Sequence, residues 1–220
     1  MFEIYYLPMN VETGVEQPEI PTMLVSLPPR RVQRSRAQDV VSLYVTVMAG
    51  RTPPARFMES LLDEAVSAYY RSAGSITNGL KTAADTINRL LVEYNAGLSI
   101  DQKGNPVTIT ANMTALKNGL LSIMHAGPTH TWLLQPNLLQ DFESDAGQGK
   151  GLGAAGSVPV RFFQAALEPD AMVLFCARPP QAWTETSLTH GPRLTINSLR
   201  RRLLSSSAGS YQAGLMQLTP

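Results

Sequence analysis

The sequence predicts an α+β fold in which helices pack on antiparallel sheets. Three observations indicate this: a nearly continuous β-branched run at Val40–Ala49, two long amphipathic helical patterns directly after it, and several short apolar runs later in the chain. Strands and helices that come in blocks, rather than in strict alternation, are typical of α+β folds. The 220 residues suffice for one sizeable core, and we expect a single domain over residues 1–220.

The first part of the chain, up to Pro29, contains five prolines among short apolar stretches. Because proline has no N–H to give to a sheet, edge strands and loops are expected here rather than a central strand. Four arginines follow, at Arg30, Arg31, Arg34 and Arg36. A solvated turn is the favoured interpretation of this cluster, and a nucleic-acid or phosphate site is the alternative.

The middle of the chain predicts a buried strand and a helix pair. Val40–Ala49 is the strand, and Gly50 ends it. Pro53–Pro54 suits a first helical turn, so a helix is expected from about Ala55 to Tyr70. Ser75 can cap a second helix that ends before Gly97. Two amphipathic helices in succession need an apolar surface to cover.

The second half of the chain supplies that surface. The predicted strands are Val107–Ala111, Gly119–His125, Thr131–Leu134, Val158–Ala166, Ala171–Ala177 and Gln212–Leu218, with a helix from about Leu194 to Leu204. Residues 126–130 have turn chemistry. The glycine-rich stretch from Gly147 to Gly153 is interpreted as a flexible connector, since it lacks the spacing and the lysine position of a phosphate loop.

Composition excludes several classes of protein. A formal net charge of +1 gives no global field for nucleic acid or an anionic membrane. The apolar runs fall short of the roughly 18 residues that cross a bilayer, and the N-terminal residues show no signal-peptide pattern. A cytoplasmic protein is therefore expected, and an extension beyond Pro220 is left open. The single Cys176 excludes an intramolecular disulfide and a Cys-rich zinc site, and we expect it to be a small buried side chain.

Three segments have the spacing of a known family. Leu167–Pro179 matches, without a gap, the pattern leucine, any residue, proline, glycine, aspartate and then an apolar strand ending Cys-Ser-Asp-Gly. His125–Leu134 corresponds to a strand–turn–strand unit around Gly-Asp-Ser, and Lys150–Gly153 to a leucine-glycine turn. In this order, and with the helix pair after Pro54, they resemble the metal-dependent type-2C serine/threonine protein phosphatases from about Val40 to Leu218.

The resemblance implies a four-layer α-β-β-α sandwich of two antiparallel sheets flanked by helix pairs. It also implies a centre in which aspartates and waters hold two Mn²⁺ or Mg²⁺ ions, and a metal-bound water attacks the phosphate. Hard divalent cations require several oxygen ligands, mostly carboxylates. Two such ions a few ångströms apart also repel each other strongly unless acidic groups lie between them.

The carboxylates are missing where the family's pattern puts them. Its first Asp-Gly-Met-Gly-Gly lines up with Val47–Arg51, and its Gly-Asp-Ser with Gly127–Thr129. Its Ser-Asp-Gly lines up with Ala177–Pro179, where an arginine replaces the ligand, and its last Asp-Asn pair falls near Gly209–Tyr211. A guanidinium is always charged and only donates hydrogen bonds, so it cannot bind the metal, although it can bind an anion.

The remaining candidates do not predict another metal site. Asp141, Glu143 and Asp145 alternate in a segment with a faint likeness to a calcium loop, but a solvated acidic turn is the favoured interpretation. His125 and His130 flank the turn at residues 127–128, and a two-histidine transition-metal site there has no evident third ligand. No metal ligand, catalytic residue or cofactor is therefore predicted.

The predicted function is that of a catalytically inactive phosphatase-like domain, of bacterial type, that acts as a signalling-related binding or regulatory module for a protein partner. An enzyme is not expected. One alternative is an active Mn/Mg-dependent serine/threonine protein phosphatase with displaced metal ligands, and another is a structural subunit completed by its partner. Nucleic acid is not expected to be a partner, and no membrane span is expected within this chain.

The candidate binding residues are His130, Arg178 and Trp183, around the former metal cleft. The competing interpretation makes them a turn residue, a solvated arginine and a tryptophan packed under a helix.

Overall fold

The computed structural model describes residues 3–18, 22–99, 104–136, 138–144, 151–154, 156–184, 188 and 195–219. Its strands are β1 (Glu3–Glu12), β2 (Val15–Glu16), β3 (Met23–Ser26), β4 (Val40–Ala49), β5 (Thr108–Lys117), β6 (Leu120–Ala126), β7 (Thr129–Gln135), β8 (Leu138–Ser144), β9 (Val160–Ala166), β10 (Met172–Cys176) and β11 (Tyr211–Thr219). Its described helices are α1 (Ala55–Arg71), α2 (Ile76–Ala96) and α5 (Ile196–Ser205), with a short 3-10 turn, Arg34–Arg36.

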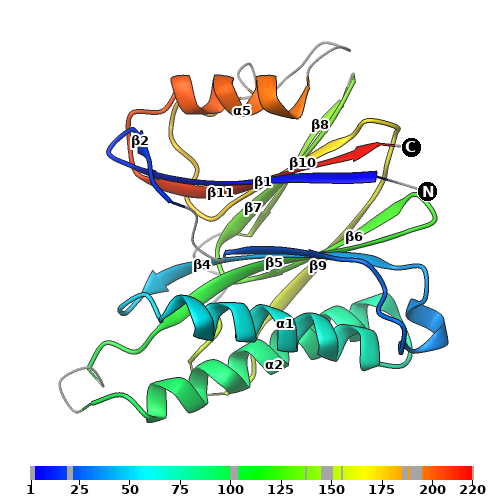
Figure 1. Cartoon of the computed structure of the whole chain (residues 1–220), viewed down its shortest axis with the longest axis vertical. Helices are drawn as coiled ribbons and strands as arrows, with labels where there is room; N and C mark the ends of the chain where they lie inside the picture. The colour runs from blue at the N-terminus through cyan, green and yellow to red at the C-terminus, as the bar shows by residue number, and fades with distance from the viewer. Residues whose placement is uncertain are drawn as a thin grey trace. The chain divides into compact units, whose positions relative to one another are not determined.

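The strands form two antiparallel sheets, and each sheet lies in its own compact unit (Figure 1). One unit comprises residues 1–20, 130–143 and 167–220, and the other comprises residues 21–129 and 144–166. The predicted α+β fold, with antiparallel sheets that carry helices, is confirmed. The single domain over residues 1–220 stays a prediction.

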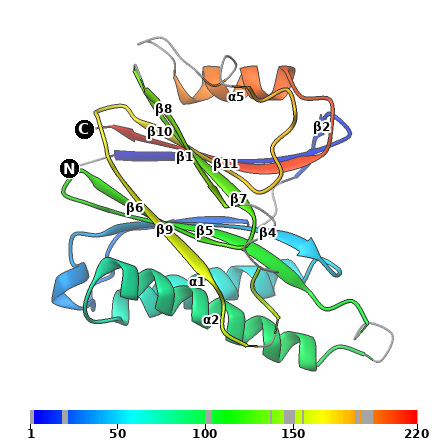
Figure 2. The same ribbon diagram turned by 180° about the vertical axis from the view of Figure 1, so that it is seen from behind.

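The five-stranded sheet has the order β3-β4-β5-β6-β9, and α1 and α2 lie side by side along one of its faces (Figure 2). The β-branched run of β4 is buried over its central residues and pairs with β5 along its length. Helix residues such as Leu61, Leu80 and Ile87 pack into one cluster with strand residues such as Leu43 and Ile109. The amphipathic helix pair therefore covers the apolar strands, as the sequence predicts.

The helix α2 begins with the cap predicted at Ser75, and it is followed by Gly97 in a conformation that does not require glycine. The Ser75 side chain accepts a hydrogen bond from the Asn78 N–H, so the predicted N-terminal cap is present. Gly97 follows the last helical residue, but its φ of −81° is right-handed. The glycine therefore does not end α2 through the left-handed conformation that favours glycine at this position.

The six-stranded sheet has the order β2-β1-β11-β10-β7-β8. All five residues of β10 are buried, and α5 packs on this sheet through Ile196, Leu199 and Leu203. Along most of its length β1 pairs only with β11, because β2 reaches only Val11 and Glu12. This leaves β1 with an open side at Pro8, which agrees with the edge strand expected near the N-terminus.

Two segments differ from their predictions. The segment with Asp141 and Glu143, expected to be a solvated turn, forms the edge strand β8; Asp145 lies outside the described residues. Charged residues at alternating positions are common on edge strands, because one face and one edge meet solvent. The expected flexible connector contains Gly151 and Gly153, which are buried and pack against the backbone of β5 and the residue before it. This part of the connector is therefore packed.

No helix in the described part of the chain is long and apolar enough to cross a membrane.

Candidate functional site

The turn between β6 and β7 is built around a tightly packed glycine and contains no acid. Gly127 has a φ of +81°, and a Cβ at this position would lie 2.9 Å from the Gly151 Cα atom. Only glycine fits such a close approach of two backbones. Pro128 occupies the position of the family's aspartate, and Thr129, which follows it, is buried. The turn that the resemblance implies is therefore present, but it offers no carboxylate.

The segments on either side of β10 likewise contain a residue with a left-handed backbone and no acid at the position of the expected ligand. The family's pattern has a glycine where this chain has Asp170, and Asp170 has a φ of +61°. Aspartate is one of the few residues other than glycine that tolerate this left-handed conformation. Asp170 therefore adopts here a conformation that a glycine adopts without strain. After β10 the chain continues as Ala177, Arg178 and Pro179, without an acid.

The residues at these positions do not fit a pair of Mn²⁺ or Mg²⁺ ions. The end of β4, the Gly127 turn, the end of β10 and the start of β11 supply no carboxylate. Among the described residues, one group of three ligating side chains comes close enough to share an ion, formed by His130, Asp141 and Glu143. One such group is too small for two divalent cations, which together need many oxygen ligands.

The predicted residues His130 and Trp183 belong to one row of aromatic rings. His130 stacks on Trp132 with ring centroids 4.9 Å apart and an interplanar angle of 9°. Trp132 meets Trp183 edge to face at 6.3 Å, and Trp183 meets Tyr211 at 5.0 Å. Burial and hydrophobic contact hold such rings in fixed orientations. The row connects the two predicted residues through a tryptophan that sequence analysis did not single out.

The individual surroundings of the three predicted residues differ. Trp183 is buried, and its Nε1–H donates to the Ser207 hydroxyl at 2.7 Å. Arg178 is exposed and lies two residues after β10. His130 lies on β7, with Nδ1 3.3 Å from the Asp141 carboxylate. Their role in binding a partner stays a prediction.

A pocket that the sequence did not reveal lies beside the Gly127 turn. It measures about 40 Å³ and is lined by His125, Gly127, Ser144, Pro159, Val160 and Arg161. His125 on β6 is paired in register with Arg161 on β9, so both side chains project from the same face of the sheet. His125 Nδ1 lies 3.1 Å from the Ser144 hydroxyl. The position of His125 in the sequence suggested only a possible metal ligand.

The chemistry of this pocket suits an anion. Its lining offers a guanidinium, an imidazole and a hydroxyl, and it contains no carboxylate. In the described part of the chain, no acidic side chain forms an ion pair with Arg161, which is exposed. Arginine binds phosphate and carboxylate groups through paired N–H donors. The space is far below the 300–1,000 Å³ of typical small-molecule sites, so it fits a single anionic group rather than a large ligand.

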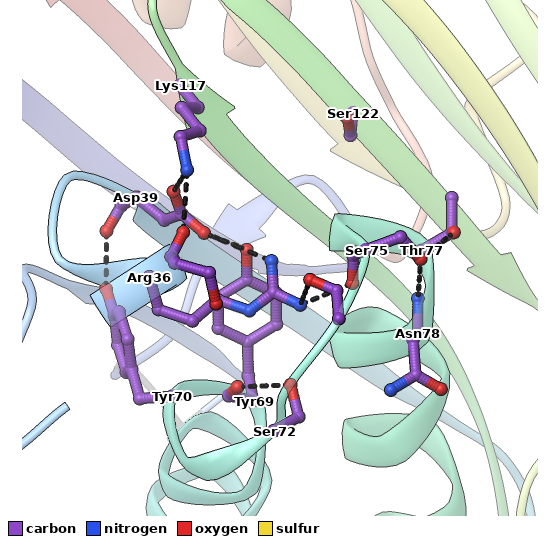
Figure 3. Close-up of polar contacts among 12 residues, drawn as sticks. Arg36, Asp39, Tyr69, Tyr70, Ser72, Ser75, Thr77, Asn78, Lys117 and Ser122 are labelled. Carbon is purple, nitrogen blue, oxygen red and sulfur yellow. Dashed lines mark hydrogen bonds and ion pairs between the residues drawn. The ribbon is translucent and has the colours of Figure 1, made fainter. Parts of the chain in front are cut away.

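A second polar cluster, drawn in Figure 3, holds the 3-10 turn against the helix pair. Arg36 Nη1 lies 3.4 Å from the Asp39 carboxylate, and Arg36 also donates to the carbonyls of Gly74 and Ser75. The Tyr69 hydroxyl donates to Asp39 at 2.7 Å. Burial, and then this hydrogen bond, raise the pKa of Tyr69 above its usual range.

The cluster corrects one prediction from the sequence. Arg30, Arg31 and Arg34 are exposed, as expected for a solvated turn, but Arg36 is only 1% exposed. Its charge is neutralised inside the protein, because Asp39 is fully buried beside it. Arg36 is therefore a structural residue and offers no surface to a nucleic acid or phosphate.

Cys176 is fully buried on β10, which confirms its prediction as a small buried side chain. Burial raises the pKa of its thiol to about 12. The thiolate, which is the nucleophilic form, is therefore scarce at neutral pH.

The fold matches those of solved bacterial phosphatases. Stp1 from Staphylococcus aureus is 13% identical with a TM-score of 0.70, over 100% of this chain and 96% of that one. The catalytic domain of PstP, solved with two manganese ions, is 13% identical with a TM-score of 0.63, over 100% of both chains. PppA, described as a key regulatory component of T6SS in Pseudomonas aeruginosa, is 14% identical with a TM-score of 0.63, over 98% of this chain and 97% of that one.

At this identity the likeness establishes the fold, and it confirms the resemblance at that level. No family model and no curated protein sequence matches the chain.

Proposed function

We propose that this chain, which shares the fold of bacterial serine/threonine phosphatases, is a catalytically inactive phosphatase-like domain that acts as a binding or regulatory module. The observation that carries the proposal is the set of side chains at the Gly127 turn. Where the family's pattern has a metal-binding aspartate, this chain has Pro128, and the adjoining pocket presents Arg161, His125 and Ser144. This set attracts an anion and repels a divalent cation.

The partner we propose is a protein that presents a phosphorylated residue to the pocket. A guanidinium with neighbouring hydroxyl and imidazole groups is a common way of binding phosphate. The pocket has room for one such group, so the rest of the partner would lie on the surface around it. A cytoplasmic location is part of the proposal, since phosphorylated signalling proteins are found there.

The first test is an assay of phosphatase activity. Purified protein is incubated with p-nitrophenyl phosphate and with a phosphoserine peptide, in millimolar Mn²⁺ or Mg²⁺. We expect no metal-dependent hydrolysis above the rate without protein, because the family's chemistry needs two bound ions and the residues for them are absent. The catalytic domain of PstP serves as the positive control.

A single alternative has an observation in its favour. His130, Asp141 and Glu143 converge, and an active phosphatase with displaced ligands would use such a group. Metal-dependent hydrolysis that the substitution Asp141→Asn abolishes would establish this alternative and overturn the proposal.

The second test measures phosphate binding at the pocket. Titration calorimetry with inorganic phosphate and with a phosphoserine peptide is expected to show binding that Arg161→Ala weakens roughly tenfold or more, since a charge-assisted hydrogen bond contributes about 1.5–3 kcal/mol. Arg89→Ala is the matched control, because Arg89 is an exposed arginine of the same compact unit that pairs with Glu93 on α2. Equal affinities of Arg161→Ala and the wild type, or no phosphate binding at all, would contradict the proposal.

A further inference from the structure

The hairpin of β7 and β8 carries a cluster of side chains that the proposed function does not use. His130 lies on β7, and Asp141 and Glu143 lie on the neighbouring strand β8. Asp141 and Glu143 are two positions apart, so both project from the same face of the strand. One atom from each of the three side chains can be chosen so that all three atoms lie within 4.8 Å of one another.

We propose that His130, Asp141 and Glu143 bind one transition-metal ion of the Zn²⁺ type. The inference does not depend on the proposed function, because it uses none of the residues of the pocket at Arg161 and none of the positions of the family's two-metal centre. An imidazole together with two carboxylates is a donor set that suits Zn²⁺. Mg²⁺ and Ca²⁺ prefer sites made of oxygen alone.

The distance between His130 and Asp141 agrees with this assignment. His130 Nδ1 lies 3.3 Å from Asp141 Oδ1, whereas Glu143 Oε1 lies 3.8 Å from the other ring nitrogen, Nε2. Because one imidazole binds an ion through a single nitrogen, the ion is assigned to Nδ1, and Glu143 has to turn toward it. Around a tetrahedral zinc ion with bonds of about 2.0–2.2 Å, neighbouring ligand atoms are roughly 3.3–3.6 Å apart. The Asp141 pair already has this spacing. Glu143 is 57% exposed, so its side chain has the freedom to turn toward the ion.

The imidazole is held in place before any ion arrives. His130 is 18% exposed, and its ring stacks on Trp132, which is itself 5% exposed within the core cluster of its sheet. A ligand whose ring orientation is fixed loses less conformational freedom on binding.

The competing interpretation of the same contacts is an ion pair between a protonated His130 and the two carboxylates. The two interpretations differ in one measurable respect. In the first, two carboxylates and a neutral imidazole bind Zn²⁺ as three ligands, so the cluster has a measurable affinity for the ion. In the second, the carboxylates are already paired with a cationic imidazole, so Zn²⁺ is not bound there.

The experiment is calorimetric titration of the full chain with Zn²⁺ at neutral pH. We expect one ion per chain, and binding at least about tenfold weaker in His130→Ala and in the double variant Asp141→Asn/Glu143→Gln. The double variant Asp63→Asn/Glu64→Gln is the matched control, because it removes the same charge from two exposed acids of α1. It should bind Zn²⁺ like the wild type.

Two further readings complete the test. Circular dichroism of the metal-free variants should match that of the wild type, because Asp141 and Glu143 lie on the edge strand β8 and His130, on β7, is not part of the buried core cluster of its sheet. Tryptophan fluorescence of the wild type should change on addition of Zn²⁺, because Trp132 stacks on His130. The inference is overturned if the wild type binds Zn²⁺ no tighter than the Asp141→Asn/Glu143→Gln variant, or if His130→Ala leaves binding unchanged. Neither result depends on phosphatase activity or phosphate binding, so this inference and the proposed function fail separately.

Discussion

Asp39→Ala is expected to lower the free energy of unfolding by about 3–5 kcal/mol, measured by urea denaturation. The substitution leaves the Arg36 guanidinium buried without its counter-charge, and removal of one partner from a buried ion pair has a cost of this size. It also leaves the Tyr69 hydroxyl without its acceptor. Arg36 keeps its bonds to the carbonyls of Gly74 and Ser75, but these carry no full charge.

The matched control is Asp85→Ala. Asp85 forms an ion pair with Lys81 on the exposed side of α2, and such pairs contribute about 0.3–0.5 kcal/mol. If Asp39→Ala fails to fold, Asp39→Asn gives the same comparison, since the amide oxygen still accepts from Tyr69 while the charge is lost. The importance of the buried pair is refuted if an Asp39 variant loses no more stability than Asp85→Ala.

Gly151→Ala is expected to lower the free energy of unfolding by roughly 3 kcal/mol or more, which is the second large effect. Gly151 has a φ of +75°, and a Cβ there would overlap the Ile109 carbonyl oxygen and lie 3.1 Å from its carbon. The left-handed conformation costs a residue with a Cβ about 1–2 kcal/mol, and overpacking adds about 1–3 kcal/mol. Gly151 also approaches Gly127 closely, so the substitution should weaken phosphate binding at the Arg161 pocket as well.

Gly119→Ala separates the two causes. Gly119 has the same φ of +75°, but a Cβ there would meet no atom within 4 Å. Gly119→Ala should therefore lower the free energy of unfolding only by the backbone strain, about 1–2 kcal/mol, and leave phosphate binding unchanged. If the two variants lose equal stability, measured by thermal or urea unfolding, then the close approach of Gly151 to β5 does not contribute to the destabilisation.

The elements predicted from the sequence succeeded where the local pattern was strong. Val40–Ala49 is β4 with the same bounds, and the Ser75 cap fixes the start of α2. The prediction failed at β8, because alternating charges there mark both an edge strand and a solvated turn. It also failed at Arg36, since nothing in a run of arginines tells which one turns inward to Asp39.

The candidate sites divide in the same way. The missing acids at the Gly127 turn and after β10 are properties of the sequence, because a residue without a carboxylate lacks it in any fold. The pocket of His125 and Arg161, in contrast, cannot be predicted from the sequence, because the sequence of a strand does not determine which other strand it pairs with.

What the amino-acid sequence determined by itself is the fold class, the order of its strongest elements and the absence of carboxylates at the positions where the resemblance implies metal ligands. The tertiary structure alone decided which remaining polar side chains meet. It placed Arg161 beside His125 through the register of β6 and β9, and the two carboxylates of β8 beside His130. The physical reason is that propensity and periodicity act over a few neighbouring residues, whereas these encounters follow from pairing between strands whose partners are chosen by the burial of a whole sheet.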